Sequence, residues 1–490
     1  AVIAPAEPGG TFLDFYRPSL LDAGLYHADG QMLDEVYVYG SFLQSAMYRA
    51  GVTCSDCHDP HGLETWAKGN ALCARCHLPA RFDVPEHTHH PAGSAGSQCV
   101  ACHLRTVTYM GVDARHDHSF RVPRPDLTVA IGVPNACGDC HADRSASWAQ
   151  EAVARWFGPR RSGEHFGRTI DAARRGDPRA HAGLLALVKD REQSGIARAS
   201  AASLLAGAND GATRDALRAA LADEDALLRI AAAEAAAGLS PQDRTALLGA
   251  ALSDRIRGVR IAAALALADL EESDVPATLR EPRSRGLVEY RSAQAEAGDQ
   301  PQAHVNLGLL ALARRDLDAA ERAYRDALRI GPYFVPAHAN LADLMRLRGD
   351  EERAESALRA GLAAVPESAD LHHALGLVLV RRGRLAEAKT ALARATELAP
   401  EQARYAYVAA VALHSSGEAV LAIDRLEKAH ARHPHDREIL LALSTMERDR
   451  GNTTAAVAWA RRLLAIDPGD ERARALVADL ERRARAEAGG

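Results

Sequence analysis

The cysteines of this chain occur only in pairs that a histidine follows directly. The pattern Cys-x-x-Cys-His occurs four times and uses all eight cysteines of the 490-residue sequence. Two thiols at this spacing can form thioether bonds to the two vinyl groups of one haem, and the adjacent histidine then reaches the iron as proximal ligand. The predicted thioether residues are Cys54, Cys57, Cys73, Cys76, Cys99, Cys102, Cys137 and Cys140. The predicted proximal ligands are His58, His77, His103 and His141.

Zinc sites and disulfides are the alternatives for paired cysteines. Zinc ribbons also use Cys-x-x-Cys pairs, but zinc does not require a histidine directly after every second cysteine, and all four pairs here have one. Closely spaced cysteine pairs are also more typical of redox motifs than of structural disulfides. We therefore expect four covalently bound c-type haems (heme c) in this part of the chain.

Each haem iron needs a second axial ligand, and the first third of the chain has more histidines than this requires. His61 lies three residues after His58 and emerges on the same side of the chain, so we expect it to bind a neighbouring iron. Met47 and Met110 are alternative ligands, which we expect to serve in packing because histidines are plentiful. Outside the four motifs, residues 1–150 contain His27, His61, His87, His89, His90, His116 and His118.

The short chain segment per haem determines the fold that we expect around the motifs. Four haems over residues 54–141 leave no room for an ordinary hydrophobic core, so the porphyrins are expected to form the core of a compact domain over residues 1–150. Residues 1–18, which contain several Pro and Gly, are predicted to form an extended arm. Residues 1–150 carry 10 Lys or Arg against 16 Asp or Glu, which favours basic redox partners and excludes nucleic acid.

A repeat of 31 residues occupies the middle of the chain. Arg198, Arg229 and Arg260 each follow an acidic turn and open an alanine-rich segment. This period predicts HEAT-like helical repeats over residues 151–285, with units shorter than the usual length of about 40 residues. The Pro- and Gly-containing stretch 276–298 is predicted to be a linker.

A repeat of 34 residues, the tetratricopeptide period, fills the last part of the chain. It predicts five tetratricopeptide repeats with a capping helix over residues 286–490. His304, His338 and His372 share this period, and we expect them to be a packed repeat position, because successive solenoid units do not surround one metal ion. The period is marked by Pro332, Pro366, Pro400, Pro434 and Pro468.

The haem motifs lie in a longer pattern that resembles a known family. Residues 39–62, His90-Pro91, Asp117-His118-Ser119-Phe120 and Pro134-Asn135-Ala136-Cys137 are similar to multihaem (tetrahaem) c-type cytochromes with C-terminal tetratricopeptide repeats. The resemblance covers about residues 25–145. It implies an all-α protein and kinship with the tetrahaem electron carriers of nitrogen metabolism. It also implies distal iron ligands at His27, His61, His90 and His118, with His89 as the competitor of His90 and the assignment of ligands to irons left open.

These features predict electron transfer through four bis-His haems, with the helical repeats docking a redox partner. Self-assembly into an extracellular haem filament through the N-terminal arm and His27 is a further expectation. A periplasmic oxidoreductase of nitrogen compounds with one open haem site is the alternative, which the surplus of histidines disfavours; a scaffold protein is the third. Because haem is attached to c-type cytochromes outside the cytoplasm, we expect a periplasmic or extracellular protein whose signal peptide was removed before Ala1. The sequence contains no run of about 18 apolar residues, so it predicts no membrane span.

Overall fold

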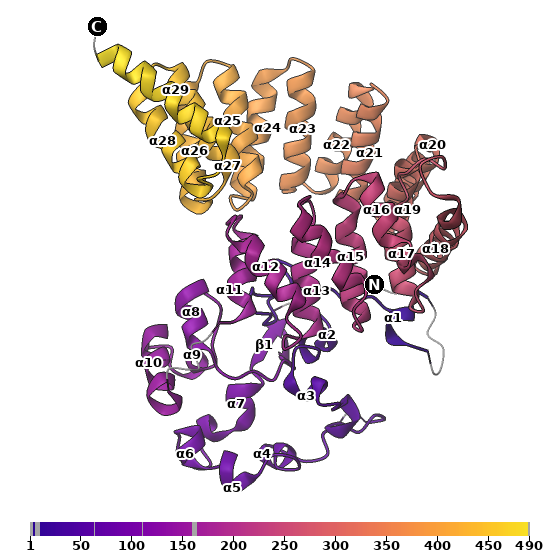
Figure 1. The fold of residues 1–490 in the computed structure, drawn as a ribbon, viewed down its shortest axis with the longest axis vertical. Coiled ribbons are helices and arrows are strands. Elements are labelled where there is room, and N and C mark those ends of the chain that lie inside the picture. Colours follow the sequence, from indigo (N-terminus) through magenta and orange to yellow (C-terminus); the bar gives the residue numbers. More distant parts are fainter. Residues whose placement is uncertain (1–2, 5–9, 63, 110, 159–163, 489–490) are drawn as a thin grey trace.

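The computed structural model describes residues 3–4, 10–62, 64–109, 111–158 and 164–488. Figure 1 shows short helices around the haem motifs at one end and an array of longer helices at the other. The described strands form one antiparallel hairpin, β1 (Thr106–Tyr109) and β2 (Asp113–His116), with Thr106 opposite His116. Among the described helices, none has the length and apolar character needed to cross a membrane. The predicted all-α class is therefore confirmed at the level of a mostly helical protein with a helical-repeat array.

Residues 10–157 contain the four Cys-x-x-Cys-His motifs and form what we call the haem-motif part. Most helices in this part are short because Pro and Gly interrupt the chain. Pro79, Pro85 and Pro125 each occupy a first helical position, and Gly132 ends a helix with a φ of 73°. The elements up to residue 157 are α1 (Phe12–Phe15), α2 (Val38–Phe42), α3 (Ala46–Arg49), η1 (Cys54–Asp56), α4 (Asn70–Cys73), α5 (Pro79–Phe82), α6 (Pro85–Thr88), η2 (Ala95–Ser97), α7 (Cys99–His103), α8 (Pro125–Ile131), α9 (Cys137–Cys140) and α10 (Ala146–Phe157).

The N-terminal arm packs against the first helical array of the same chain. Leu21 donates its backbone N–H to the Ser200 hydroxyl at 2.9 Å, and Arg17 forms an ion pair with Glu234 at 2.6 Å. Leu20, Leu21, Tyr26 and Met32 belong to one continuous core with the middle of the chain. The arm is therefore held by its own chain, and the haem-motif part and the first array share a core.

The first array repeats one type of ion pair at the 31-residue spacing. Three arginines, one per unit, form buried or half-buried ion pairs with a carboxylate of the next unit: Arg198 with Asp223, Arg229 with Asp254, and Arg260 with Glu289. The elements are α11 (Phe166–Arg174), α12 (Ala180–Lys189), α13 (Gly195–Leu204), α14 (Gly211–Leu221), α15 (Ala226–Ala235), η4 (Ala236–Gly238), α16 (Pro241–Leu248), η5 (Ala251–Ser253), α17 (Arg257–Leu265) and α18 (Ala277–Glu296).

The linker prediction for residues 276–298 is wrong, because this stretch forms the helix α18. Its glycine serves close packing rather than flexibility. A Cβ added at Gly286 would lie 2.6 Å from the Cβ of Ala264 on α17. The buried Arg283 further attaches α18 to the array by donating to the Leu267 and Leu270 carbonyls.

The second array consists of five helix pairs and a closing helix. The repeated alanines on the second helix of each pair are fully buried, so adjacent helices approach closely. A residue with positive φ ends the first helix of each pair, which is Arg315 in the first unit and a glycine in the others. The helices are α19 (Pro301–Ala313), α20 (Leu317–Ile330), α21 (Val335–Leu347), α22 (Glu351–Ala364), α23 (Ala369–Arg381), α24 (Leu385–Leu398), α25 (Ala403–Ser415), α26 (Ala419–Arg432), α27 (Arg437–Asp449), α28 (Thr453–Ile466) and α29 (Glu471–Ala488).

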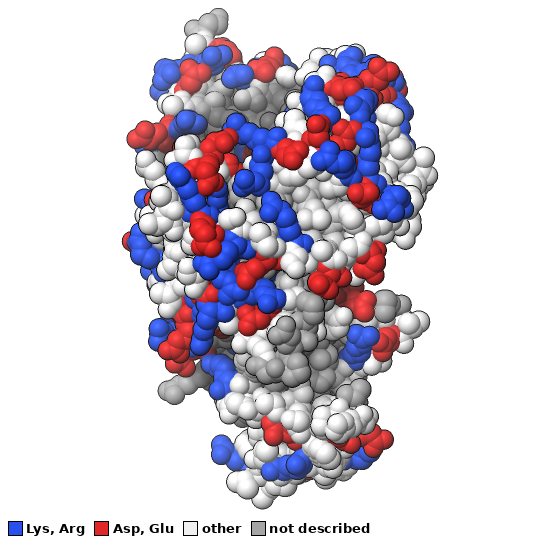
Figure 2. Space-filling model, turned by 90° about the vertical axis from the view of Figure 1, so that its right-hand side faces the viewer, with Lys and Arg blue, Asp and Glu red and all other residues white. Residues whose placement is uncertain are grey.

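The periodic histidines of this array have one structural role. His304, His338 and His372 each bond through Nε2 to the backbone carbonyl six residues earlier, at 2.9, 2.7 and 2.9 Å. They are a repeat position, as the spacing predicts. Figure 2 shows Lys and Arg interspersed with Asp and Glu over the helical arrays on one face, so neither sign dominates there.

Candidate haem-binding site

Each Cys-x-x-Cys-His motif folds as a single helical turn. The backbone N–H of His58, His77 and His141 each donates to the carbonyl of the first cysteine of its motif at 2.9 Å, and the third motif in the chain forms α7. One turn places both thiols and the histidine ring near the same side of the chain. The local structure therefore meets the requirement for attaching one haem at each motif.

The four motifs follow one another in space in the order of the sequence. The Cys57 thiol lies close to Cys73, and Cys99 forms a side-chain hydrogen bond with Cys73. Cys102 in turn lies close to Cys137. Burial, followed by the neighbouring Cys73 thiol, raises the pKa of Cys99 to about 11. Successive attachment points are thus adjacent along a single path.

Three proximal histidines each have a second histidine ring at nearly the same distance. The ring centroids are 6.3 Å apart for His58 and His118, 6.2 Å for His87 and His103, and 6.1 Å for His90 and His141. The angles between the ring planes are 29°, 14° and 34°, respectively. Of the histidines outside the motifs, His118 lies in the β2–α8 loop, His87 lies on α6 and His90 follows α6. Segments distant in sequence from the motif that they face therefore supply these rings.

The separation of these pairs fits an iron atom between two imidazoles. A bond from a metal to an imidazole nitrogen is about 2.0 Å, and each ring centroid lies about 1.1 Å behind its nitrogen, which gives about 6.2 Å between centroids. The three observed separations bracket this value. These residues therefore fit the axial ligands of three haems.

Backbone hydrogen bonds orient one ring in each pair. The Nδ1 atoms of His118, His103 and His90 bond to the carbonyls of His116, Arg121 and Thr88 at 2.9, 2.7 and 2.7 Å. A ring that donates Nδ1–H to a carbonyl presents its Nε2 lone pair to a metal. Burial also lowers the pKa of His118, which favours the neutral ring that binds iron.

Large hydrophobic side chains around the motifs are exposed or only partly buried. Among the described hydrophobic residues between Leu43 and Tyr109, none is buried. Trp66 and Leu78 beside the first two motifs are 51% and 70% exposed. Such exposure of large apolar groups is consistent with four flat apolar cofactors covering them.

The predicted distal ligands are placed differently from one another. His118 and His90 each pair with a proximal histidine, whereas His89 stacks on Trp156 at 4.1 Å. His27 lies in a tight loop among Arg105, Arg121 and Arg174, and burial lowers its pKa. His61 is exposed. Within the described residues, no histidine ring contact is found for His27 or His61.

His87 is a pairing residue that sequence reasoning did not select. It lies three residues before His90, on the single turn of α6. His87 and His90 are three residues apart, as His58 and His61 are. The argument that assigns His58 and His61 to separate irons therefore applies to this pair as well, and it is the sequence signal for His87. His77 contacts the edge of Phe82 at 5.8 Å, and the described part of the chain shows no second histidine ring against it.

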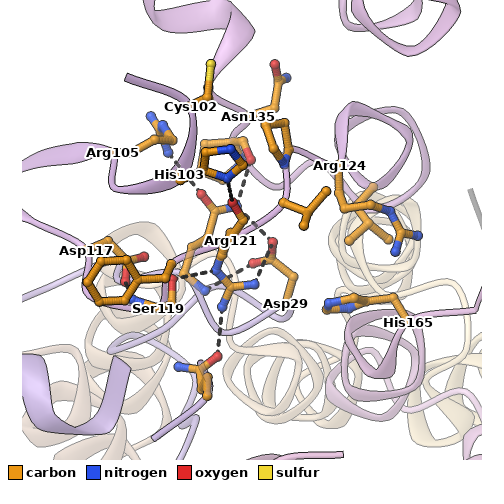
Figure 3. A pocket seen from close by; sticks show the side chains of 18 of the residues that line it. Asp29, Cys102, His103, Arg105, Asp117, Ser119, Arg121, Arg124, Asn135 and His165 are labelled. Carbon is orange, nitrogen blue, oxygen red and sulfur yellow. Dashed lines mark hydrogen bonds and ion pairs between the residues drawn. The ribbon is translucent and has the colours of Figure 1, made fainter. Parts of the chain in front are cut away.

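A cavity of about 500 Å³ adjoins the third motif. It is lined by Cys102, His103 and Arg121 on one side and by His165 at the start of α11 on the other (Figure 3). His165 caps α11 by accepting the Gly167 N–H at 3.0 Å. Burial, followed by the charge of Arg121, lowers the pKa of His165 to about 4.

Comparisons with known proteins concern the helical-repeat part of the chain. Residues 286–333, 346–412 and 413–480 match family models described as tetratricopeptide repeat. The C-terminal part of the chain is a tetratricopeptide-repeat array. The prediction of these repeats is thus confirmed. The comparison with curated proteins gives no match.

Solved structures with tetratricopeptide-like arrays are similar over part of the chain. MamA protein is 23% identical and covers 35% of this chain and 93% of its own, with a TM-score of 0.31. The pilF protein of Pseudomonas aeruginosa is 21% identical, with coverages of 40% and 94% and a TM-score of 0.32. YrrB, a TPR protein with an unusual peptide-binding site, is 20% identical, with coverages of 37% and 93% and a TM-score of 0.31.

Proposed function

We propose that this protein is a tetrahaem c-type cytochrome that transfers electrons and docks a partner through its tetratricopeptide repeats. The observation that carries the proposal is the set of three histidine pairs at 6.1–6.3 Å, each of which includes the histidine of a Cys-x-x-Cys-His motif. When bound, each haem supplies one-electron exchange at its iron. The four motif cysteine pairs hold the haems, and the histidine pairs ligate three of the irons.

The protein's own residues would favour rapid electron exchange with little rearrangement. One ring of each pair is held by a backbone carbonyl, and the attachment points succeed one another along the chain. Bis-His ligation supports low potentials, because histidine stabilises ferrous iron less than methionine does. In this proposal, His61 supplies the second ligand of the His77 iron, following the spacing argument for neighbouring irons.

The location and partners follow from the same proposal. Covalent haem attachment places the protein in the periplasm or outside the cell. Tetratricopeptide arrays bind peptides or proteins on their concave face, which provides a docking surface for a redox partner protein. For self-assembly into a filament, arm exchange would have to break the Arg17–Glu234 pair and the Leu21–Ser200 bond.

Haem counting and ligand spectroscopy test the proposal. A pyridine haemochrome assay on protein expressed with periplasmic haem-attachment machinery should give four haems per chain. Fewer than four would contradict the tetrahaem assignment. Low-temperature EPR of the ferric protein should show low-spin bis-imidazole signals for at least three of them.

A second candidate function rests on the surroundings of His77. Because the described histidines leave this ring without a histidine ring contact, an open iron at the second motif would permit an oxidoreductase of small nitrogen compounds. Ferric protein would then show one high-spin haem that binds cyanide or nitrite. An all-low-spin spectrum that these ligands leave unchanged favours the electron carrier.

A further inference from the structure

We propose that Arg121 is a positioning residue that fixes the proximal ligand His103 and thereby sets the potential of the third haem. The inference rests on the proposed cytochrome function. Arg121 and His103 are joined twice: the Arg121 N–H donates to the His103 carbonyl at 3.0 Å, and His103 Nδ1 donates to the Arg121 carbonyl at 2.7 Å. The orientation of the ring therefore depends on where the Arg121 backbone is held.

The guanidinium of Arg121 anchors that backbone to three other points (Figure 3). Its Nε donates to the Ser119 hydroxyl at 2.8 Å, its Nη2 donates to Gln44 Oε1 at 2.7 Å, and its Nη1 lies 3.7 Å from the Asp29 carboxylate. The Asp29 side chain is only 3% exposed. Ser119 lies in the same loop as Arg121, Gln44 follows α2, and Asp29 lies in the N-terminal loop, so Arg121 joins its own loop to two other segments beside the cavity.

The hydrogen bond at His103 Nδ1 has a chemical consequence as well as a geometric one. Donation from the non-ligating nitrogen makes the imidazole a more basic ligand and stabilises ferric iron, which lowers the potential. The His87–His103 pair is also the most nearly parallel of the three, with 14° between ring planes. Releasing Arg121 should weaken this bond and allow the ring to rotate.

Arg124 offers a matched control in the same cavity. Its guanidinium makes a bidentate contact with Asp126 at 2.7 and 2.9 Å, and Asp126 retains Arg168 at 3.4 Å if Arg124 is removed. The described hydrogen bonds of the Arg124 side chain do not involve a histidine of the three pairs. Its replacement should therefore alter the cavity without altering the ring of His103.

The experiment compares Arg121→Met, Arg121→Lys and Arg124→Met in the full chain with haems attached. Haem content by pyridine haemochrome, four potentials by spectroelectrochemical titration, and EPR g-values are measured for each. In Arg121→Met, one of four potentials should become more positive and one low-spin EPR signal should change, with four haems retained. Arg121→Lys should show a smaller change in the same direction, and Arg124→Met should match the parent.

Two outcomes separate this inference from the proposed function. Four haems in the Arg121 variants, with all potentials and g-values unchanged, overturn the positioning role and leave the cytochrome assignment intact. Fewer than four haems in the parent protein contradict the tetrahaem assignment, and no covalent haem contradicts the cytochrome assignment itself. If Arg121→Met does not fold, Arg121→Lys decides the question alone, because it keeps the charge and stem but cannot reproduce the three anchoring contacts.

Discussion

If the protein binds four haems as proposed, replacing His87 by alanine should convert one of them from low spin to high spin. The His87 ring lies 6.2 Å from that of His103, the distance that one shared iron requires, and one imidazole can ligate only one iron. The thioether bonds at Cys99 and Cys102 would remain, so haem content should not fall. The low-spin EPR intensity of the ferric protein is therefore expected to drop by about a quarter, with a matching high-spin signal.

Two single-residue comparisons make this test specific. His27→Ala should leave the spin states unchanged, because His27 lies among arginines rather than against a motif histidine. His89→Ala is the matched control two residues away, since its ring stacks on Trp156. Full low-spin intensity in His87→Ala together with a high-spin haem in His27→Ala would refute the use of ring separation to assign the ligands.

Three further perturbations address stability. Arg229→Ala should cost about 3 kcal/mol, because it leaves the Asp254 carboxylate largely buried without its ion pair, and hydrogen exchange of α15 and α17 should rise accordingly. His165→Asn should lessen the pH dependence of stability, measured by urea unfolding. The pKa of His165 is about 4 in the folded state and about 6.5 in the unfolded state, so protonation favours the unfolded chain. The free energy of unfolding of the parent should therefore fall as the pH drops below 6.5, by on the order of 2 kcal/mol near pH 5. Deleting residues 1–30 should unfold much of the first array, seen as lost helical circular dichroism, since it exposes several large apolar side chains at about 2 kcal/mol each.

Each of these predictions has its own contrary result. Arg218 forms an exposed pair with Asp215, so Arg218→Ala should change stability by less than about 0.5 kcal/mol, and equal effects at Arg218 and Arg229 would remove the role given to burial. If stability depends on pH in the same way in His165→Asn and in the parent, His165 has the same protonation state in the folded and the unfolded chain. A truncated chain that melts like the full one would mean that the arm is not part of the core.

The helical repeats could be predicted from sequence because their information is local and repeated. A 34-residue period determines which alanines are buried and where each helix ends, and the structure places these residues as the period requires. The 31-residue period likewise identified Arg198, Arg229 and Arg260, although the carboxylate partner of each is visible only in space. The linker prediction for residues 276–298 fails because it treats Pro and Gly as helix breakers, whereas Gly286 permits close helix packing.

The pairing of histidines could not be predicted in the same way. A distal ligand is a contact between residues far apart in sequence, such as His58 with His118, and one sequence carries no period or spacing that fixes it. Local spacing helps only to exclude, since two histidines three residues apart emerge on the same side of the chain and cannot ligate opposite faces of one haem. Applied consistently, that rule would have placed His87 beside His90 among the ligands.

The N-terminal loop connects the first helical array to the segment that carries His118, which gives this array a structural role beside the proposed docking. Arg174 of α11 donates to the Tyr26 and Leu21 carbonyls at 3.0 and 2.7 Å, so the first array holds this loop. The same loop donates the Met32 N–H to Asp117 at 3.3 Å, directly beside His118. Because the loop is held at both ends, a displacement of α11 relative to the haem-motif part must alter either the Arg174 contacts or the segment that carries His118. The haem-motif part and the first array are therefore mechanically continuous, and removal of the array should disturb the segment that carries His118.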